Sequence, residues 1–307
     1  MLDQPVDPDL VAAAVDDTIT ATAVERAPSR RLGVLGWGSI GWLAALTVTA
    51  ALADVLPLDD PERTFRGLVG RGPGTSGHLL GGDGNGRDLF ARVVFGARSS
   101  LLLAVGAVSV GLIIGGTAGL IAGYVRGRVD AVVTVLLDAM LAFPALVLAL
   151  TLVTTLAGDP DTTYLRRLGV LILALGIVSI PIVARVARVN TLTWSQREFI
   201  TAARAAGATH RRIVGREILP NVLPAMFSAT LLGIAILIVA EGGLSILGVG
   251  IKNSPSLGNI IAVGRDDLRS APHIVFAPVA VIFLTVLALN LLGDIVRARV
   301  DVRDNAL

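Results

Sequence analysis

The chain has 307 residues, of which 53% are hydrophobic and only 16% are charged. Soluble domains average about 25% charged residues, and the mean hydropathy of this chain is +0.75. The composition therefore excludes a disordered chain, a coiled coil and most soluble enzymes. A net charge of +2 gives no argument for a nucleic-acid partner, and the absence of cysteine excludes disulfides and thiol chemistry. These properties predict a protein with several membrane spans.

Six apolar runs are long enough to cross a bilayer as helices, because about 20 residues span a hydrocarbon core of roughly 30 Å. Their continuity favours helices over a β-barrel, in which apolar and polar residues alternate. The third run is interrupted by Asp138, and the fourth extends around Arg185 to Val189. The runs cover residues 32–53, 99–125, 131–158, 168–184, 221–240 and 274–293.

The distribution of arginine sets the expected orientation, because the cytoplasmic loops of membrane proteins are enriched in Lys and Arg. Seven arginines and two glutamates occupy segment 185–217, between the fourth and fifth spans. Six spans place both termini on one side, which we assign to the cytoplasm. The expected fold is an all-α integral membrane protein with six transmembrane helices, cytoplasmic N and C termini, and a short cytoplasmic coupling helix between helices 4 and 5.

This topology divides the chain into five parts. We expect a disordered cytoplasmic tail, a first transmembrane helix, an extracytoplasmic loop, a five-helix core that contains the cytoplasmic segment 191–220, and a second cytoplasmic tail. In chain order these parts are residues 1–31, 32–56, 57–98, 99–299 and 300–307. The first apolar run is longer than a signal-peptide core of about 7–15 residues, so we do not expect it to be cleaved.

The cytoplasmic segment 197–221 carries local helix signals. Its alanine-rich start favours a helix over 198–206, after which Gly207 suits the left-handed position that ends a helix. Thr209 suits the N-cap of a second helix, and Pro220 either closes that helix or kinks it into the next span. The small side chains predict a smooth surface that another protein can approach closely. A helix-turn-helix DNA reader is a poor alternative, because about 30 residues cannot form its core, whereas a purely structural loop stays open.

The same segment resembles the EAA loop of the inner-membrane permease subunits of bacterial ABC importers. The family pattern is Glu-Ala-Ala, three residues, Gly, nine residues, Ile, one residue and Leu-Pro. Ala202-Ala203, Gly207 and Leu219-Pro220 match this pattern. Thr201 stands in the Glu place and Glu217 in the Ile place. These two departures leave unchanged the Gly and the Leu-Pro that carry the geometry.

Four further stretches resemble the dipeptide and oligopeptide branch of that family, and its "C" permease in particular. They occur in the family's order, and the likeness runs from about residue 30 to residue 303. In the first stretch Gly82 replaces the usual Thr. The stretches are 78–88 (HLLGGDGNGRD), 122–144 (with Ala-Gly-Tyr at its start and Leu-Ala-Phe-Pro at its end), 241–250 (EGGLSILGVG) and 290–294 (NLLGD).

The resemblance implies a transport subunit and not an enzyme, namely a permease that translocates dipeptides or oligopeptides in an ATP-driven importer. Glutathione and nickel complexes are alternative ligands in neighbouring branches. The implied partners are a homologous second permease, one or two cytoplasmic ATPase subunits that bind ATP and Mg²⁺, an extracytoplasmic binding protein, and the bilayer of the bacterial inner membrane. The residues expected to couple to the ATPase are Glu198, Thr201, Ala202, Ala203, Arg204, Ala205, Ala206, Gly207 and Ala208.

Charged residues inside spans are costly, so each needs a partner or a wet cavity. We expect Asp138 to pair with Arg185 or Arg188 at similar depth, in a packing or a gating role. Glu241 is expected either to line the translocation cavity or to bond to backbone amides at a break at Gly242-Gly243. The glycines of the second span (106, 111, 115, 116 and 119) indicate close helix packing, within the chain or against a second permease.

The remaining motifs point to no chemistry of their own. The glycine-rich stretch 81–86 lacks the Gly-Lys-Ser/Thr of a phosphate-binding loop, and its spacing lacks the oxygen ligands of an EF-hand. It is best interpreted as a turn-rich extracytoplasmic loop. The three histidines, His78, His210 and His273, fall in different loops, so we expect no metal site. A membrane-embedded enzyme lacks its cluster of reactive residues, and a secondary transporter lacks its repeats.

Overall fold

In a computed structural model, the described residues are 33–157, 163–251 and 254–304, with side chains up to residue 298. The expected tail 1–31 and residues 305–307 lie outside this part, whereas 300–304 continue the last helix. The helices are α2 (Val34–Ala51), α3 (Leu89–Val110), α4 (Gly116–Val125), α5 (Gly127–Leu141), α6 (Ala145–Ala157), α7 (Tyr164–Trp194), α8 (Glu198–Ala205), α9 (His210–Arg212), α10 (Leu219–Ile246), α11 (Leu257–Gly264) and α12 (His273–Asp304). Two π-helical turns, η2 (Gly111–Gly115) and η3 (Ile213–Ile218), join α3 to α4 and α9 to α10.

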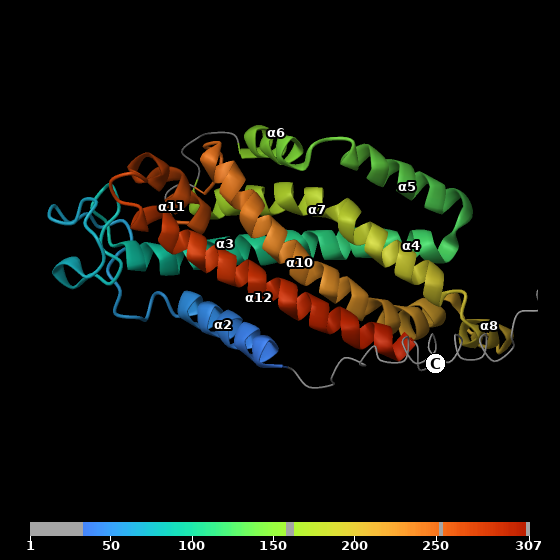
Figure 1. Cartoon of the computed structure of the whole chain (residues 1–307). Helices are drawn as coiled ribbons and strands as arrows, with labels where there is room; N and C mark the ends of the chain where they lie inside the picture. The colour runs from blue at the N-terminus through green and yellow to red at the C-terminus, as the bar shows by residue number, and fades with distance from the viewer. Residues whose placement is uncertain (1–32, 158–162, 252–253, 305–307) are drawn as a thin grey trace, which may run out of the picture. The chain divides into compact units, whose positions relative to one another are not determined.

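Helices are the only regular secondary structure among the described residues, which also contain two isolated β-bridges. Five continuous helical stretches are long and apolar enough to cross a membrane, and the bent pair α5 and α6 makes a sixth if it is counted as one span. Figure 1 shows these helices side by side, with the loop that precedes α3 at one end and α8 at the other. The expected class, a helical protein with several membrane spans, is confirmed. The five stretches are 34–51, 89–125, 164–194, 210–246 and 273–298.

The second span begins at Leu89, well before the apolar run that starts at residue 99. Its N-cap is Asp88, whose carboxylate accepts a hydrogen bond from the Phe90 amide at 3.1 Å. Two arginines in the first turns, Arg92 and Arg98, are neutralised by acidic residues of the preceding loop. Paired charges therefore hide the start of this helix from a search for charge-free runs. The loop before it ends at Asp88 and is shorter than the expected 57–98.

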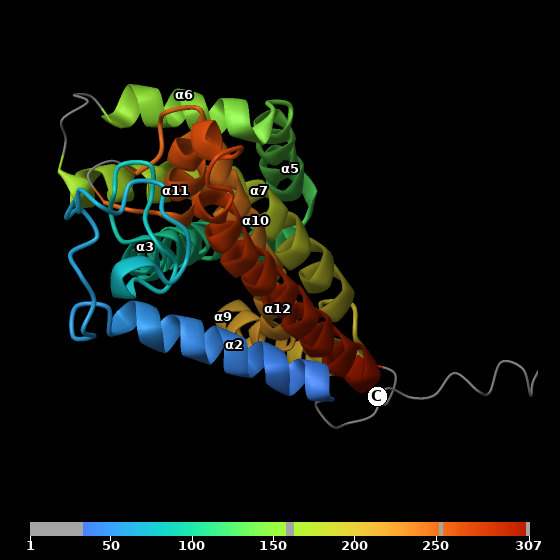
Figure 2. The ribbon, with the colours of Figure 1, turned by 60° about the vertical axis from the view of Figure 1, so that its left-hand side comes forward.

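The expected third span, 131–158, is not one straight helix. Helix α5 ends at Leu141 and α6 starts at Ala145, and the two are bent by 86°. Pro144 explains the break, because proline lacks an N–H donor and disfavours helical geometry in the residue before it. Figure 2 shows α6 leaving the direction of α5 at this elbow.

Helix α7 is central to the bundle and packs against α3, α4, α5, α6 and α10. The glycines of the second span make its closest contacts possible. A methyl group added at Gly115 or Gly119 would meet the backbone carbonyl oxygen of Ile180 or Ala184 in α7. Gly106 and Gly111 also face α7, and Gly116 faces Met226 of α10. The reading of these glycines as packing within the chain is confirmed.

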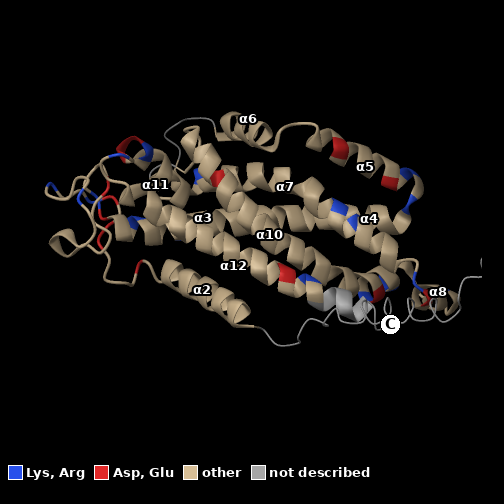
Figure 3. Ribbon diagram, in the orientation of Figure 1, with Lys and Arg blue, Asp and Glu red and all other residues tan. Residues whose placement is uncertain are grey.

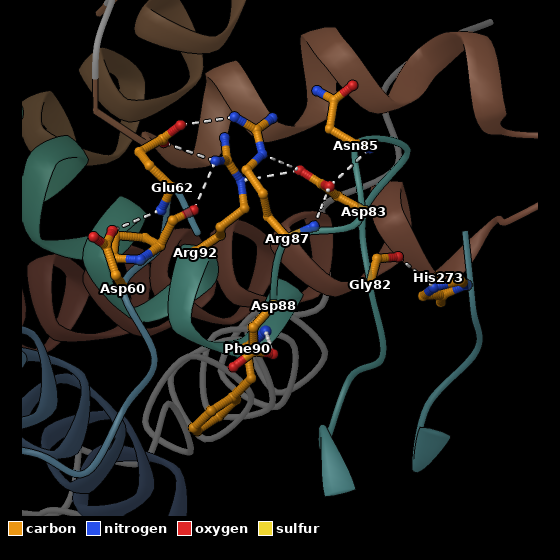
Figure 4. Close-up of polar contacts among 11 residues, drawn as sticks. Asp60, Glu62, Gly82, Asp83, Asn85, Arg87, Asp88, Phe90, Arg92 and His273 are labelled. Atoms are coloured by element: carbon orange, nitrogen blue, oxygen red, sulfur yellow. Dashed lines mark hydrogen bonds and ion pairs between the residues drawn. The ribbon is translucent and has the colours of Figure 1, made fainter. Parts of the chain in front are cut away.

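The loop between α2 and α3 is held by an ion-pair network (Figure 4). Asp83 accepts hydrogen bonds from the amides of Asn85 and Arg87, both at 2.9 Å, and from the Arg87 guanidinium. Glu62 receives one hydrogen bond from Arg87 and one from Arg92, both at 2.8 Å. The carboxylate in the glycine-rich stretch is thus used to close its own turn, as a turn-rich loop requires.

Candidate functional site

Helix α8 ends as its sequence predicts. Gly207 has φ +79°, and its amide donates to the Arg204 carbonyl at 3.0 Å while the Ala208 amide donates to the Ala203 carbonyl at 3.0 Å. These two bonds form a Schellman motif, which requires a left-handed residue after the helix. Thr209 then caps α9, since its hydroxyl accepts from the Arg212 amide at 3.4 Å. Both local predictions are confirmed.

One side of α8 is anchored, and the other is exposed within the part of the chain that the structure describes. Ile200 is the buried residue of the helix, and it belongs to a cluster with Leu120 of α4, Trp194 of α7 and Ile213 of η3. Ala203 and Ala208 are half-buried against this cluster. The other residues expected to couple to an ATPase are exposed: Glu198, Thr201, Ala202, Arg204, Ala205, Ala206 and Gly207. The segment therefore offers a patch of small residues, flanked by Glu198, Phe199 and Arg204, at a fixed position.

Pro220 neither closes a helix nor produces a sharp break. Residues 210–246 form one continuous helical stretch, in which the π-helical turn η3 ends at Ile218, two positions before Pro220. A π turn changes the local hydrogen-bond register, which accommodates a residue that has no N–H to donate. The segment after α8 therefore continues directly into the span α10.

The site also includes residues that the sequence did not single out for it. The Tyr124 hydroxyl at the end of α4 lies 2.7 Å from Nδ1 of His210, and the Arg204 guanidinium lies 5.6 Å from the centre of the Tyr124 ring. Arg126 donates a hydrogen bond to the Ser195 hydroxyl at 2.9 Å. These contacts join α4 to both ends of α8, across 86 and 69 residues of sequence respectively.

Two ion pairs join α5 to α7. Asp138 accepts a hydrogen bond from Arg185 at 2.5 Å, which confirms the expected pairing. Arg188 pairs instead with Asp130, which it contacts through both Nε and Nη2. The side chains of Asp138 and Arg185 are each 54% exposed, so within the described residues much of this pair is uncovered. Figure 3 shows acidic residues on α5 and basic residues on the neighbouring part of α7.

One of the two expectations for Glu241, a break at Gly242-Gly243, is wrong, and its place on the translocation cavity stays a prediction. Helix α10 continues through Gly242 and Gly243 without a break, and Glu241 is fully buried. Its carboxylate accepts hydrogen bonds from Ser245 and Ser256 at 2.7 Å and from Ser100 at 3.3 Å. An apolar groove of about 1020 Å³ lies beside α10. Ala240 and Gly242 line this groove, but Glu241 does not. Glu241 instead ties together α3, α10 and α11.

One group in the described residues offers metal-ligating atoms close together. Nδ1 of His78 lies 3.6 Å from Asp88 and 3.9 Å from Asp59, and the ligand atoms all lie within 4.8 Å of one another. Asp88 already caps α3. This capping role accounts for the position of its carboxylate.

Comparison with known proteins agrees with this geometry. The family described as "Binding-protein-dependent transport system inner membrane component" matches residues 115–303. The glutathione transport system permease protein GsiD of Pectobacterium atrosepticum is 37% identical over 80% of this chain and 79% of its own length. The di/tripeptide transport system permease protein DppC of Pseudomonas aeruginosa is 33% identical over 86% of each chain.

Solved structures show the same fold. The MetNI methionine ABC transporter, in an inward-facing conformation, contains a chain with a TM-score of 0.57 and 20% identity, which aligns over 68% of this chain and 97% of its own length. A permease of this family works with ATPase and binding-protein partners. The chain is thus a multi-pass membrane protein and a transport subunit, and it belongs to the inner membrane components of binding-protein-dependent ABC importers.

Proposed function

We propose that this chain is one of two permease subunits of a bacterial inner-membrane importer for short peptides, including dipeptides and oligopeptides. Relatives at 33–37% identity are named dipeptide, di/tripeptide and glutathione permeases, and glutathione is itself a tripeptide. The shared chemistry is a small molecule with a free ammonium, a carboxylate and peptide bonds. Both termini of the chain and α8 lie on the cytoplasmic side in this proposal.

The observation that carries the mechanism is the surface of α8. Its exposed residues include the small side chains of Thr201, Ala202 and Ala205, beside the larger Glu198, Phe199 and Arg204. The Gly207 end adds no Cβ above the helix terminus. Such a helix fits a groove on an ATPase subunit at close range. The ATPases would bind ATP and Mg²⁺, since this chain has a single lysine, Lys252, outside any phosphate-loop pattern. ATP can drive transport only if it binds two states of the complex with different affinity.

The charged residues of the spans divide into two roles in this proposal. The pair Asp138–Arg185, half-exposed among apolar residues, is assigned to the wall of the pathway or its gate, because an uncovered charge pair in a span needs water or protein against it. Arg188 secures the start of α5 through Asp130. Glu241 is a structural residue.

The test is uptake by the reconstituted complex. The permease, its second permease, its ATPases and the cognate extracytoplasmic binding protein are assembled in proteoliposomes, and uptake of a labelled dipeptide, a tripeptide, an oligopeptide, glutathione and a nickel–histidine complex is compared. Short-peptide uptake that requires internal ATP supports the proposal. Uptake of the nickel complex alone, or uptake without ATPases, contradicts it. Preference for glutathione over all peptides identifies the alternative that the relatives named GsiD favour.

A further inference from the structure

The turn between α4 and α5 has an unusual backbone. Arg126 has φ +61° and ψ −166°, and Gly127 follows with φ +59°. A positive φ is uncommon for a residue with a side chain, and such a conformation persists when its surroundings determine it. The Arg126 guanidinium donates to Ser195 at 2.9 Å, and Ser195 is buried at the end of α7, directly before the segment that contains α8.

Tyr124, near the end of α4, contacts residues within α8 and after it. The Tyr124 hydroxyl contacts His210, which starts α9 just after α8, and Arg204 of α8 itself lies against the Tyr124 ring. The end of α4 and the α4–α5 turn are therefore attached to Ser195 before α8, to Arg204 within α8, and to His210 after it. Figure 1 shows α4 and α8 at the same end of the bundle.

Helix α5, which leaves this turn, is weakly anchored by apolar contacts. Leu137 is the one buried residue among its fifteen, all of which the structure describes. Its polar links to α7 are the pairs Asp130–Arg188 and Asp138–Arg185, and the 86° elbow separates its far end from α6. An element with few buried side chains and a hinge at each end can move while the packed helices stay in place.

We propose that the α4–α5 turn receives the movement of α8 and transmits it to α5, and that the two ion pairs to α7 hold α5 in the conformation seen here. Tyr124, Arg126 and Ser195 are positioning residues in this mechanism. The inference rests on the proposed contact of α8 with an ATPase. It adds the path by which movement at that contact is transmitted to the membrane-spanning helices.

The absence of cysteine allows a direct test in the assembled importer. Val135→Cys on α5 and Val189→Cys on α7 replace exposed side chains (66% and 56%) and carry spin labels. Their distance is measured by pulsed electron paramagnetic resonance without nucleotide and with ATP and vanadate. We expect ATP to shift this distance. The double variant Tyr124→Phe and Ser195→Ala removes two hydrogen-bonding hydroxyls, which should abolish the shift and lower uptake per ATP hydrolysed by roughly tenfold.

A matched control removes two hydroxyls from the same helices. Thr117→Ala in α4 deletes hydrogen bonds to carbonyls of the adjoining η2, and Thr193→Ala deletes one to a carbonyl of α7 itself. These bonds are local, so this variant should keep the ATP-driven shift and the uptake ratio. The Tyr124→Phe and Ser195→Ala single variants are measured as well, and they decide the question if the double variant fails to assemble with the ATPase.

The outcomes separate the inference from the function on which it rests. A shift and an uptake ratio that survive in the Tyr124 and Ser195 variants would overturn the transmission path and leave the docking of α8 intact. A parent complex in which ATP leaves the α5–α7 distance unchanged would overturn the transmission path, and a parent complex without ATP-dependent uptake would overturn the proposed function as well. Loss of the shift in the variants but not in the control supports the path.

Discussion

Substitutions of Gly207 can distinguish two roles of this residue: the left-handed backbone that ends α8, and the absence of a side chain on the surface that α8 exposes. A Cβ built at Gly207 meets no atom within 4 Å, so a side chain causes no clash within the chain. The remaining cost is the left-handed backbone at φ +79°, about 1–2 kcal/mol for an ordinary L-residue. Such a cost lowers the fraction of chains with a closed helix end about 5- to 30-fold. Asparagine adopts this conformation more readily than alanine or valine.

We therefore compare Gly207→Asn, Gly207→Ala and Gly207→Val. If α8 docks against a close-fitting groove, Asn should uncouple the importer even though it keeps the helix end, because its side chain projects into the interface. The assay is peptide uptake divided by ATP hydrolysed in proteoliposomes, with the thermal midpoint of the purified complex as a check on folding. We expect uptake per ATP to fall at least about tenfold in Asn and Val, with midpoints within a few degrees of the parent.

Two results would refute this reasoning. Full coupled uptake by both Gly207→Asn and Gly207→Val would show that no partner approaches this surface closely. Coupling that is normal in Asn but lost in Ala and Val would show that the left-handed conformation matters and that the absence of a side chain does not.

Three other changes follow from the packing of the spans. Asp138→Asn should change the free energy of unfolding by less than about 1 kcal/mol, as expected for a half-exposed pair, yet reduce uptake. Exchanging the two charges, by combining Asp138→Arg with Arg185→Asp, should restore uptake. Failure of this exchange would exclude a role for the pair itself. Glu241→Ala should leave three serine hydroxyls without their acceptor and cost about 1–3 kcal/mol or more, whereas Glu241→Gln should be milder; equal thermal midpoints for both would contradict the buried network. Gly115→Leu should separate η2 from α7 and lower the midpoint of the detergent-purified chain. The same change at exposed Gly38, where a Cβ meets no atom within 4 Å, should not.

Local features of the fold were predictable from the sequence. Gly207 and Thr209 act through bonds to residues three to five positions away, so composition and spacing predict them. The partnership of Asp138 with an arginine was predictable as well, because a charge inside a span requires one. In each case the physical requirement lies within a few residues or within one span.

Features that depend on distant residues were not predictable. Glu241 is satisfied by Ser100, which lies 141 positions away, and no local pattern reports that distance. The start of α3 was missed because loop acids neutralise its arginines. Pro144 was visible in the sequence, but the apolar run continues through it, and hydropathy gives no information about direction.

The elbow at Pro144 has a consequence for how the surface of this chain should be understood. Helix α5 has 15 residues, a length of about 22 Å at 1.5 Å per residue, and α6 departs almost at a right angle to it. Neither segment alone crosses roughly 30 Å of hydrocarbon, and the backbone groups freed at the corner cannot be satisfied by acyl chains. This flank must therefore be covered by a neighbouring polypeptide or by confined water, so the isolated subunit is incomplete on this side.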